Sequence, residues 1–292
     1  MNTSKLKTYA PAARAAFIEA VTRRAGVFGI RPGAVEAVSE TGDVAMIGGQ
    51  AFPRSIVPLR KKLIERIGRG GFDAVMEAAA YTWFNRLVAI RFMEIHGYFD
   101  HGFCVLSDPR GGQMPEILQK AEQVVWDGLD RDEVVRLKLA GNRDEELYRL
   151  LLTAQCQELN RIMPDVFGKL EDETVLLLPD NLLHSDSLVR QLVAASYPAD
   201  WQEVEVLGWL YQFYISEKKD AVMGRKSAVP KEDIPAVTQL FTPHWIVRYL
   251  VENSLGRLWV LNRPNSKLRE HMPYYIEESG AGVPPARDIN NA

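Results

Sequence analysis

The stretch FDAVMEAAAYTWFNRLVAIRFMEIH, residues 72–96, is the longest helical pattern in this sequence, and Gly97 follows it as a stop. Apolar side chains lie on most sides of the helix that it predicts: Val75, Met76, Ala79, Trp83, Leu87, Val88, Ile90, Phe92 and Met93. A helix that is apolar nearly all round is buried, so we expect a central helix with others packed against it. Arg91 and Glu94 lie one turn apart on it, and because buried charges need partners we expect a structural network there before a functional site.

Further helical patterns occur on both sides of this segment. They cover residues 11–24, 54–67, 115–126, 131–139 and 143–160, then a helix capped by residues 185–187 that runs to Ala195, and another from Pro198 to Tyr214. Residues 35–47 place two short apolar runs around Gly42 and predict a small hairpin. The run Val175-Leu176-Leu177-Leu178 fits a strand or a buried helical edge equally well. The fold class predicted is therefore mainly α, a multi-helix module with one small β-hairpin.

The composition is that of a globular protein, with 47% hydrophobic and 25% charged residues in 292. No apolar run is long enough to span a bilayer, so we expect no membrane partner. The start, MNTSKLK, lacks the apolar core of a signal peptide. Cys104 and Cys156 are the two cysteines, which implies no disulfide framework and fits a reducing cytoplasm.

The basic residues are concentrated near the N-terminus. Residues 1–70 hold twelve Lys and Arg against five Asp and Glu, a net charge of +7, and because the whole chain carries -3 the remainder carries -10. Such a segment is typical of a nucleic-acid footprint, and Arg60, Lys61, Lys62 and Arg66 on the helix predicted over 54–67 are the candidate DNA-binding residues. The solvated faces of ordinary helices give the same pattern, so both interpretations stay open here.

No metal site is expected. His96, His101 and Cys104 are close in sequence, but a structural zinc site needs four ligands, and Cys156 and His184 lie far away without paired spacing. The glycine cluster at 68–71 follows a helix rather than a strand, so it is not a dinucleotide-binding loop.

The stretch QLFTPHWIVRYL, residues 239–250, predicts a sharply started amphipathic helix. Thr242 is the expected N-cap and Pro243 the expected first helical residue. The apolar residues then recur at helical spacing: Ile246, Val247, Leu250, Val251 and Leu255.

Phe241-Thr242-Pro243 and its helix resemble the Phe-Thr-Pro element of adenine-specific DNA methyltransferases. Two further stretches, together with the start MNTSKLK at 1–7, narrow the resemblance to the N-terminal region of the PglX family, the methyltransferases of BREX phage-defence systems. One is AYTWFNRL at 80–87 running to RFMEIHGY at 91–98, and the other is LGWLYQFY at 207–214 with KKD at 218–220. The resemblance extends to about Tyr275. The resemblance implies an S-adenosylmethionine cofactor. Phe241 is expected to line the cofactor site and Thr242 to contact the polar end of the cofactor. Pro243 completes the cofactor-binding segment and joins it to the helix.

The resemblance also implies double-stranded DNA and other BREX proteins as partners. It departs from the family at the end of the sequence, where a glycine-rich cofactor loop and an Asn-Pro-Pro-Tyr motif should follow. Residues 278–282 imitate the first and Pro284-Pro285 the second, but a proline run stands where a helix should start, and the Asn and the aromatic residue are missing. We therefore expect an N-terminal fragment, without catalytic residues and inactive alone, that ends just before an α/β methyltransferase domain.

The predicted organisation has four parts: a basic helical and hairpin segment at 1–70, a helical domain at 71–235, the Phe-Thr-Pro helix at 236–276 and a disordered tail at 277–292. Two alternatives stay open. The chain is a non-catalytic helical module that binds DNA or other proteins, or the Phe-Thr-Pro match is a coincidence in a plain helical protein.

Overall fold

The computed structural model describes residues 3–167, 173–195, 197–238 and 240–277. The chain divides into two compact units, unit 1 at Met1–Thr238 and unit 2 at Gln239–Ala292. Helices dominate both units, and the strands within the described residues form two small antiparallel sheets in unit 1, so the mainly α prediction is confirmed. Across the described parts of the chain, no helix is both long and apolar enough to cross a membrane.

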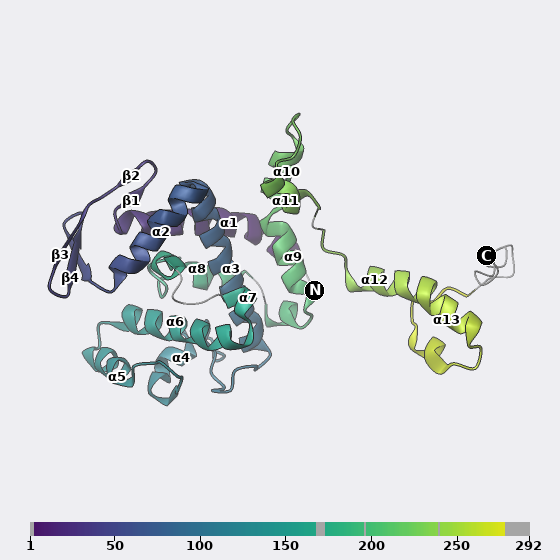
Figure 1. Cartoon of the computed structure of the whole chain (residues 1–292). Helices are drawn as coiled ribbons and strands as arrows, with labels where there is room; N and C mark the ends of the chain where they lie inside the picture. Colours follow the sequence, from purple (N-terminus) through teal and green to yellow (C-terminus); the bar gives the residue numbers. More distant parts are fainter. Residues whose placement is uncertain (1–2, 168–172, 196, 239, 278–292) are drawn as a thin grey trace. The chain divides into compact units, whose positions relative to one another are not determined.

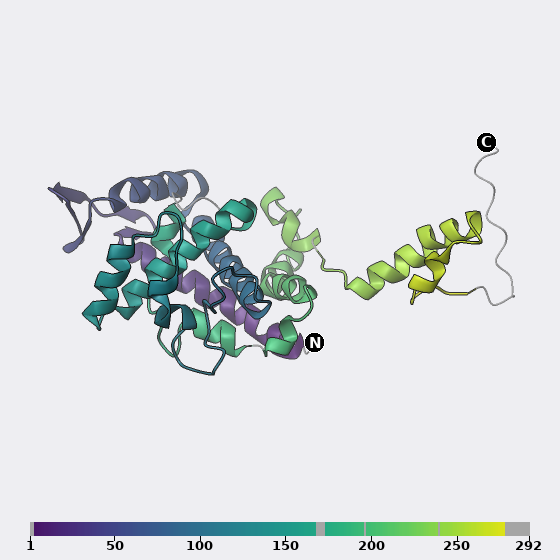
Figure 2. The ribbon, with the colours of Figure 1, turned by 90° about the horizontal axis from the view of Figure 1, so that it is seen from below.

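The centre of unit 1 is helix α3, Phe72–Ile95, as the sequence predicts. It packs against α1, Thr3–Val27, and α1 also packs against α9, Glu205–Tyr214, as Figures 1 and 2 show. The rings of Phe17 in α1 and Phe84 in α3 meet edge to face with centroids 5.7 Å apart, both buried. The core that forms around this pair draws on residues from both sides of residue 70.

Helix α1 begins earlier than the sequence predicts. It runs through Pro11 instead of starting there. A proline inside a helix removes one backbone hydrogen bond, but Leu6 and Ala10 lie on the buried face of α1 with Phe17. Burial of this face therefore outweighs the local cost and extends the helix two turns toward the N-terminus.

The predicted hairpin is confirmed and turns out to be part of a larger sheet. Strands β3, Val38–Thr41, and β4, Val44–Ile47, pair around Gly42, whose φ of 58° needs glycine. A third strand, β5 at Gln50–Pro53, pairs with β4 and was not predicted. A separate pair, β1 at Ile30–Arg31 and β2 at Ala34–Val35, precedes them, so Val35 belongs to a different sheet from the one predicted. Figure 1 shows the strands at one end of unit 1, beside α2.

The remaining helices of unit 1 follow in order: α2 Ile56–Gly70, α4 Glu116–Gln119, α5 Arg131–Ala140, α6 Asp144–Ile162, α7 Pro164–Phe167, α8 Leu188–Ala194, α10 Ser216–Met223 and α11 Ile234–Thr238. Short 3-10 helices lie between them at Ala121–Gln123, Glu173–Leu177, Pro198–Trp201 and Lys231–Asp233. The ambiguous run at 175–178 is thus mostly a buried 3-10 helix. Ser187 caps α8 by accepting from the N–H of Arg190, as predicted. The single helices expected over 115–126 and 198–214 are each broken into shorter pieces.

Unit 2 contains α12, His244–Val251, and α13, Arg257–Asn262, joined by a π-helical turn at Glu252–Gly256. A 3-10 helix at Lys267–His271 completes it. The buried carboxylate of Glu252 holds these pieces together, because it accepts from Nε of Arg248 at 3.1 Å and from the N–H of Tyr274 at 2.6 Å. The predicted disordered tail and the two imitation motifs at 278–285 lie almost wholly outside the described residues.

Candidate nucleic-acid interface and cofactor segment

Helix α2 carries the four residues predicted to bind DNA, and of these four the side chain of Arg60 is the buried one. The Arg60 side chain is buried, and its guanidinium donates to the carbonyl of Phe28 at 2.7 Å and to that of Glu36 at 2.6 Å. These bonds tie α2 to the segment that holds the first strand pair. The hydrogen-bonding capacity of Arg60 therefore serves the fold.

The outward face of α2 presents the other cations. Lys62, Arg66 and Arg69 follow one another at i, i+4 and i+7 and so share one side of the helix, with Lys62 and Arg69 exposed. Lys61 is also exposed, beside this row. Arg66 is half-buried and pairs with Glu173 at 3.1 Å. Arg69, which the sequence did not single out, donates through Nε to the carbonyl of Glu65 at 3.3 Å, a bond that leaves its terminal nitrogens to outside groups.

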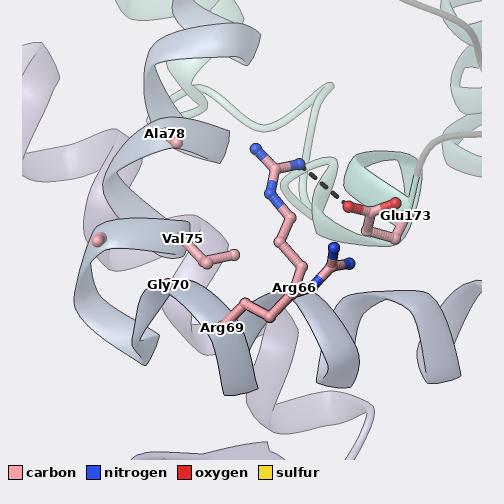
Figure 3. Close-up of a pocket in the computed structure, with 7 residues that line it drawn as sticks. Arg66, Arg69, Gly70, Val75, Ala78 and Glu173 are labelled. Carbon is pink, nitrogen blue, oxygen red and sulfur yellow. Dashed lines mark hydrogen bonds and ion pairs between the residues drawn. The ribbon is translucent and has the colours of Figure 1, made fainter.

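A groove lies where α2 meets α3, and Figure 3 shows Arg66 and Arg69 at its edge with Glu173 across it. Its volume is about 660 Å³, and Gly70, Ala74, Val75 and Ala78 form its apolar floor. Gly71 makes the turn between the two helices at a φ of 82°, which favours glycine. Two guanidinium groups face one carboxylate here, so the groove has a net positive charge suited to an anion such as a phosphate.

The cofactor segment lies in unit 2, where Phe241 and Pro243 are half-buried and Thr242 is exposed. The helix begins at His244, one residue later than expected, and Pro243 is its N-cap residue. The carbonyl of Pro243 accepts from the N–H groups of Ile246 at 3.0 Å and Val247 at 3.3 Å. The prediction that Thr242 caps the helix is wrong, because the extended backbone of Pro243 separates them. Within the described residues the Thr242 hydroxyl makes no hydrogen bond, which leaves it to a ligand.

Within unit 2, the apolar face predicted for the helix after Pro243 is largely uncovered. No residue of α12 is buried. Trp245 is 54% exposed, Leu250 57% and Leu255 68%. Leu255 also lines a cavity of about 340 Å³, together with Trp259 and Met272. Side chains of this kind are normally covered by a partner surface.

Arg91 and Glu94 form the predicted internal network. Both are buried, and besides Arg91 the Glu94 carboxylate accepts from the N–H groups of Val105 and Leu106, each at 2.8 Å, and from the Ser107 hydroxyl at 3.0 Å. Every acceptor oxygen of Glu94 is therefore occupied by the protein. The network fixes the loop after α3.

The histidines and cysteines are held separately. Nε2 of His96 lies 2.7 Å from the carbonyl of Trp201, and Nε2 of His101 lies 2.9 Å from Oε1 of Gln155. Both cysteines are free thiols; burial raises the pKa of half-buried Cys104 to about 11 and that of buried Cys156 to about 12. In the part of the chain that the structure describes, no cluster of His, Cys, Asp or Glu could hold a metal ion.

Two curated proteins are similar to this chain over almost all of its length. The adenine-specific methyltransferase BrxX of Escherichia coli O9:H4 (strain HS) is 49% identical over 284 residues, which cover 95% of this chain and 23% of BrxX. The adenine-specific methyltransferase PglX of Lacticaseibacillus casei (strain Zhang) is 34% identical over 284 residues, 89% of this chain and 23% of that protein. No protein-family model matches the chain. The resemblance predicted from the sequence is therefore confirmed, and this chain is a relative of the PglX-type adenine-specific methyltransferases over slightly less than a quarter of their length.

Proposed function

We propose that this chain is the helical N-terminal module of an S-adenosylmethionine-dependent DNA N6-adenine methyltransferase that acts in BREX phage defence in the cytoplasm. The observation that carries the proposal is the similarity to BrxX and PglX over 95% and 89% of the chain. The Phe241-Thr242-Pro243 segment at the start of an uncovered apolar helix supports it. In this proposal the module scaffolds the catalytic part, supplies one wall of the cofactor site and contacts DNA.

The residues present fit one side of a cofactor site. Phe241 offers a partly exposed aromatic ring, and Thr242 offers a hydroxyl without a partner in the described structure, placed just before the positive end of α12. When bound, S-adenosylmethionine supplies the methyl group that the reaction transfers. Phe241 would exclude water and orient the cofactor, and Thr242 would hold a polar group of it.

The family's motif for holding a target adenine does not occur in this sequence. N6 transfer needs the base flipped out of the duplex, with its amino group held in line with the methyl group. The Asn-Pro-Pro-Tyr motif that serves this purpose in the family is missing from the sequence. We therefore infer that the 292-residue chain alone does not methylate DNA.

A chimera tests the proposal. The matched 284 residues of the E. coli relative are replaced by this chain, and N6-methyladenine is measured in genomic DNA by mass spectrometry. We expect methylation by the chimera and about a tenfold rise in KM for S-adenosylmethionine in its Phe241→Ala variant, the effect of losing one stacking contact. Val125→Ala, which truncates an exposed apolar residue of unit 1, is the control and should leave KM unchanged. A folded chimera without methylation, or equal KM values for both variants, contradicts the proposal.

A second function, DNA binding by the module itself, is favoured by the exposed cations of α2. Lys61, Lys62 and Arg69 are the residues that we propose contact phosphates, with Arg66 set at the edge of the groove. Binding of this type weakens linearly with the logarithm of salt concentration, and each phosphate contact adds about one to the slope. Gel shifts with duplex DNA at several salt concentrations test this point.

In those gel shifts we expect Lys62→Ala and Arg69→Ala each to lower the salt slope by about one. Lys226→Ala, at an exposed site outside α2, is the charge-matched control and should leave the slope unchanged. Equal slopes for all variants would remove α2 from the interface, and absence of binding at low salt would leave proteins, such as other BREX components, as the partners.

A further inference from the structure

Another cavity of unit 1 is lined by elements other than α2. Its volume is about 360 Å³, large enough for one or two side chains of a bound molecule. Three stretches far apart in the sequence form its walls: the end of α3 with the loop that follows it, residues 123–126, and the second half of α6. The residues proposed above to contact DNA or the cofactor lie elsewhere, so this cavity belongs to neither of those sites.

The inner surface of the cavity is apolar and aromatic, and contacts within the protein hold it in place. Its apolar and aromatic members include Met93, Phe99, Trp126 and Leu159. The ring of His101 stacks on that of Phe99 at 5.2 Å and meets that of Trp126 edge to face at 5.4 Å, both measured between centroids. Nε2 of His101 lies 2.9 Å from Oε1 of Gln155, which is 2% exposed. Because these contacts form the surface in advance, a bound molecule would not have to order it.

Two large apolar side chains of the lining are exposed to solvent. Tyr98, in the loop after α3, is 59% exposed, and Ile162, the last residue of α6, is 70% exposed. Exposed apolar side chains gathered at a preformed cavity are typical of surfaces that bind another protein. A small cation or metabolite inside the cavity would leave both side chains in contact with water. The occupant that fits the whole surface is therefore a polypeptide segment.

The charge at the cavity is negative. In the described structure the lining residues that carry a formal charge are Asp100 and Glu158. Asp100 is exposed, and among the described residues its carboxylate makes no hydrogen bond or ion pair. Glu158 pairs with Arg161 at 3.2 Å, and Arg161 also lies 3.4 Å from Asp127, so three carboxylates share one cation. The charge of this surface is therefore complementary to a basic segment, unlike that of the arginine groove.

We propose that this cavity and its exposed apolar residues dock a segment of a partner protein that presents an arginine beside apolar side chains. The guanidinium pairs with the Asp100 carboxylate, and the aliphatic stem and its apolar neighbours cover Tyr98 and Ile162. Arginine suits the site better than lysine, because its planar fork binds a carboxylate through two hydrogen bonds and also stacks on rings such as that of Trp126. A second copy of this chain fits poorly, because a twofold contact would set Asp100 and Glu158 against the same acids of the other copy.

A selection from a random peptide library displayed on phage tests the proposal without a known partner. The full chain and its Asp100→Lys variant serve as targets in parallel, and the bound peptides are sequenced. We expect the unchanged chain to enrich arginine next to leucine, isoleucine or aromatic residues. The Asp100→Lys variant should enrich aspartate or glutamate in place of the arginine, because the charge at the docking surface is then reversed.

The peptide most enriched by the unchanged chain is then synthesised with arginine and with glutamate at the selected position, and fluorescence anisotropy gives both affinities. Glutamate should weaken binding to the unchanged chain about tenfold, and Asp100→Lys should reverse the order of the two peptides. Asp220→Lys makes the same charge change at an exposed aspartate of α10 outside the cavity, and this matched control should keep the preference of the unchanged chain. Ile162→Ser should weaken both peptides about tenfold, because apolar contact is lost.

The three substituted residues are exposed, so we expect the variants to fold, and circular dichroism verifies this. Three results would overturn the proposal: acidic or purely apolar peptides selected by the unchanged chain, the same peptides selected by both targets, or an unchanged preference for arginine in Asp100→Lys. Sedimentation velocity covers one further outcome. Self-association of the unchanged chain that Ile162→Ser abolishes would assign the surface to a second copy, and this result would overturn the proposal as well.

Discussion

The guanidinium of Arg91 lies 2.5 Å from Oε1 of Glu94, one turn further along α3, and neither side chain is more than 6% exposed. The pair therefore neutralises two charges inside the core, and the same carboxylate binds the backbone of the following loop. Removing one partner of such a pair leaves the other charge buried and unpaired.

Glu94→Gln is consequently expected to lower the free energy of unfolding by about 3 to 5 kcal/mol. Urea unfolding followed by circular dichroism measures the change. The matched control is Glu133→Gln, which breaks another Arg–Glu pair spaced i,i+3 but on the exposed surface of α5, and which should leave the unfolding midpoint nearly unchanged. Equal losses of unfolding free energy in the two variants would mean that the buried pair stabilises the fold no more than the exposed pair does.

Arg60 and Lys61 are neighbours with opposite roles. Arg60→Met keeps the aliphatic stem but leaves the carbonyls of Phe28 and Glu36 without their donor, so we expect a loss of about 2 to 4 kcal/mol in unfolding free energy. Lys61→Met changes an exposed side chain and should leave the unfolding midpoint unchanged, while weakening DNA binding at low salt. Thermal unfolding and gel shifts on the same two proteins test both halves of the expectation.

The state of His101 gives a pH dependence. Its Nδ1 accepts from the N–H of Phe103 at 3.1 Å, so the proton is on Nε2, which donates to Gln155. Burial lowers the pKa of His101 below its ordinary value of 6.5, although Gln155 and two acids act in the opposite direction. As the pH falls, His101 is therefore protonated in the unfolded chain before it is protonated in the folded protein. The stability that neutral His101 contributes is present above pH 6.5 and is lost as the pH falls below that value.

Unfolding free energies at about pH 7.5 and about pH 5.5 measure this loss. The His101→Phe variant should show a smaller decrease between the two values than the unchanged protein. His184, which is exposed, provides the control, and His184→Gln should keep the full decrease. A decrease in His101→Phe as large as in the unchanged protein would assign the effect to other groups.

The uncovered apolar face of unit 2 predicts binding of a hydrophobic dye. Leu250→Lys combined with Leu255→Lys should reduce dye fluorescence by at least half, because it breaks the contiguous patch. Leu139 is 80% exposed on α5 and serves as the control site, where the same change to Lys should have little effect. A similar reduction from Leu139→Lys would show that the dye does not select unit 2.

Some of this fold follows from local sequence alone. The burial of α3 could be predicted because apolar residues surround it, and the start of α8 because Ser187 is a strong cap. The extension of α1 past Pro11 could not, because the contacts that stabilise α1 come from α3 and α9, far away in the sequence. Strand β5 was missed for a related reason, since Gln50–Pro53 is short, ends in proline and is specified by its neighbour β4.

The same division applies to the candidate site. The basic row on α2 and the Phe-Thr-Pro segment could be found from residue types and spacing. Arg60 is buried because its guanidinium binds two backbone carbonyls outside α2, and the groove at Arg69 depends on the turn at Gly71. Neither feature could be predicted without the structure. The cavity of about 500 Å³ that Tyr81, Tyr211 and Tyr214 help to line joins five helices, so it needed the structure, although these tyrosines lie in the stretches 80–87 and 207–214 that the sequence singled out.

The buried thiol of Cys156 can be used to measure how often the folded protein opens. Alkylating reagents attack the thiolate, and burial raises the pKa of Cys156 to about 12, so the folded protein presents almost none of it. Cys156 sits on α6 in the centre of the core, where a reagent can reach it only when the helix detaches. The rate at which Cys156 is alkylated, followed by mass spectrometry, therefore reports how often unit 1 opens in the absence of denaturant.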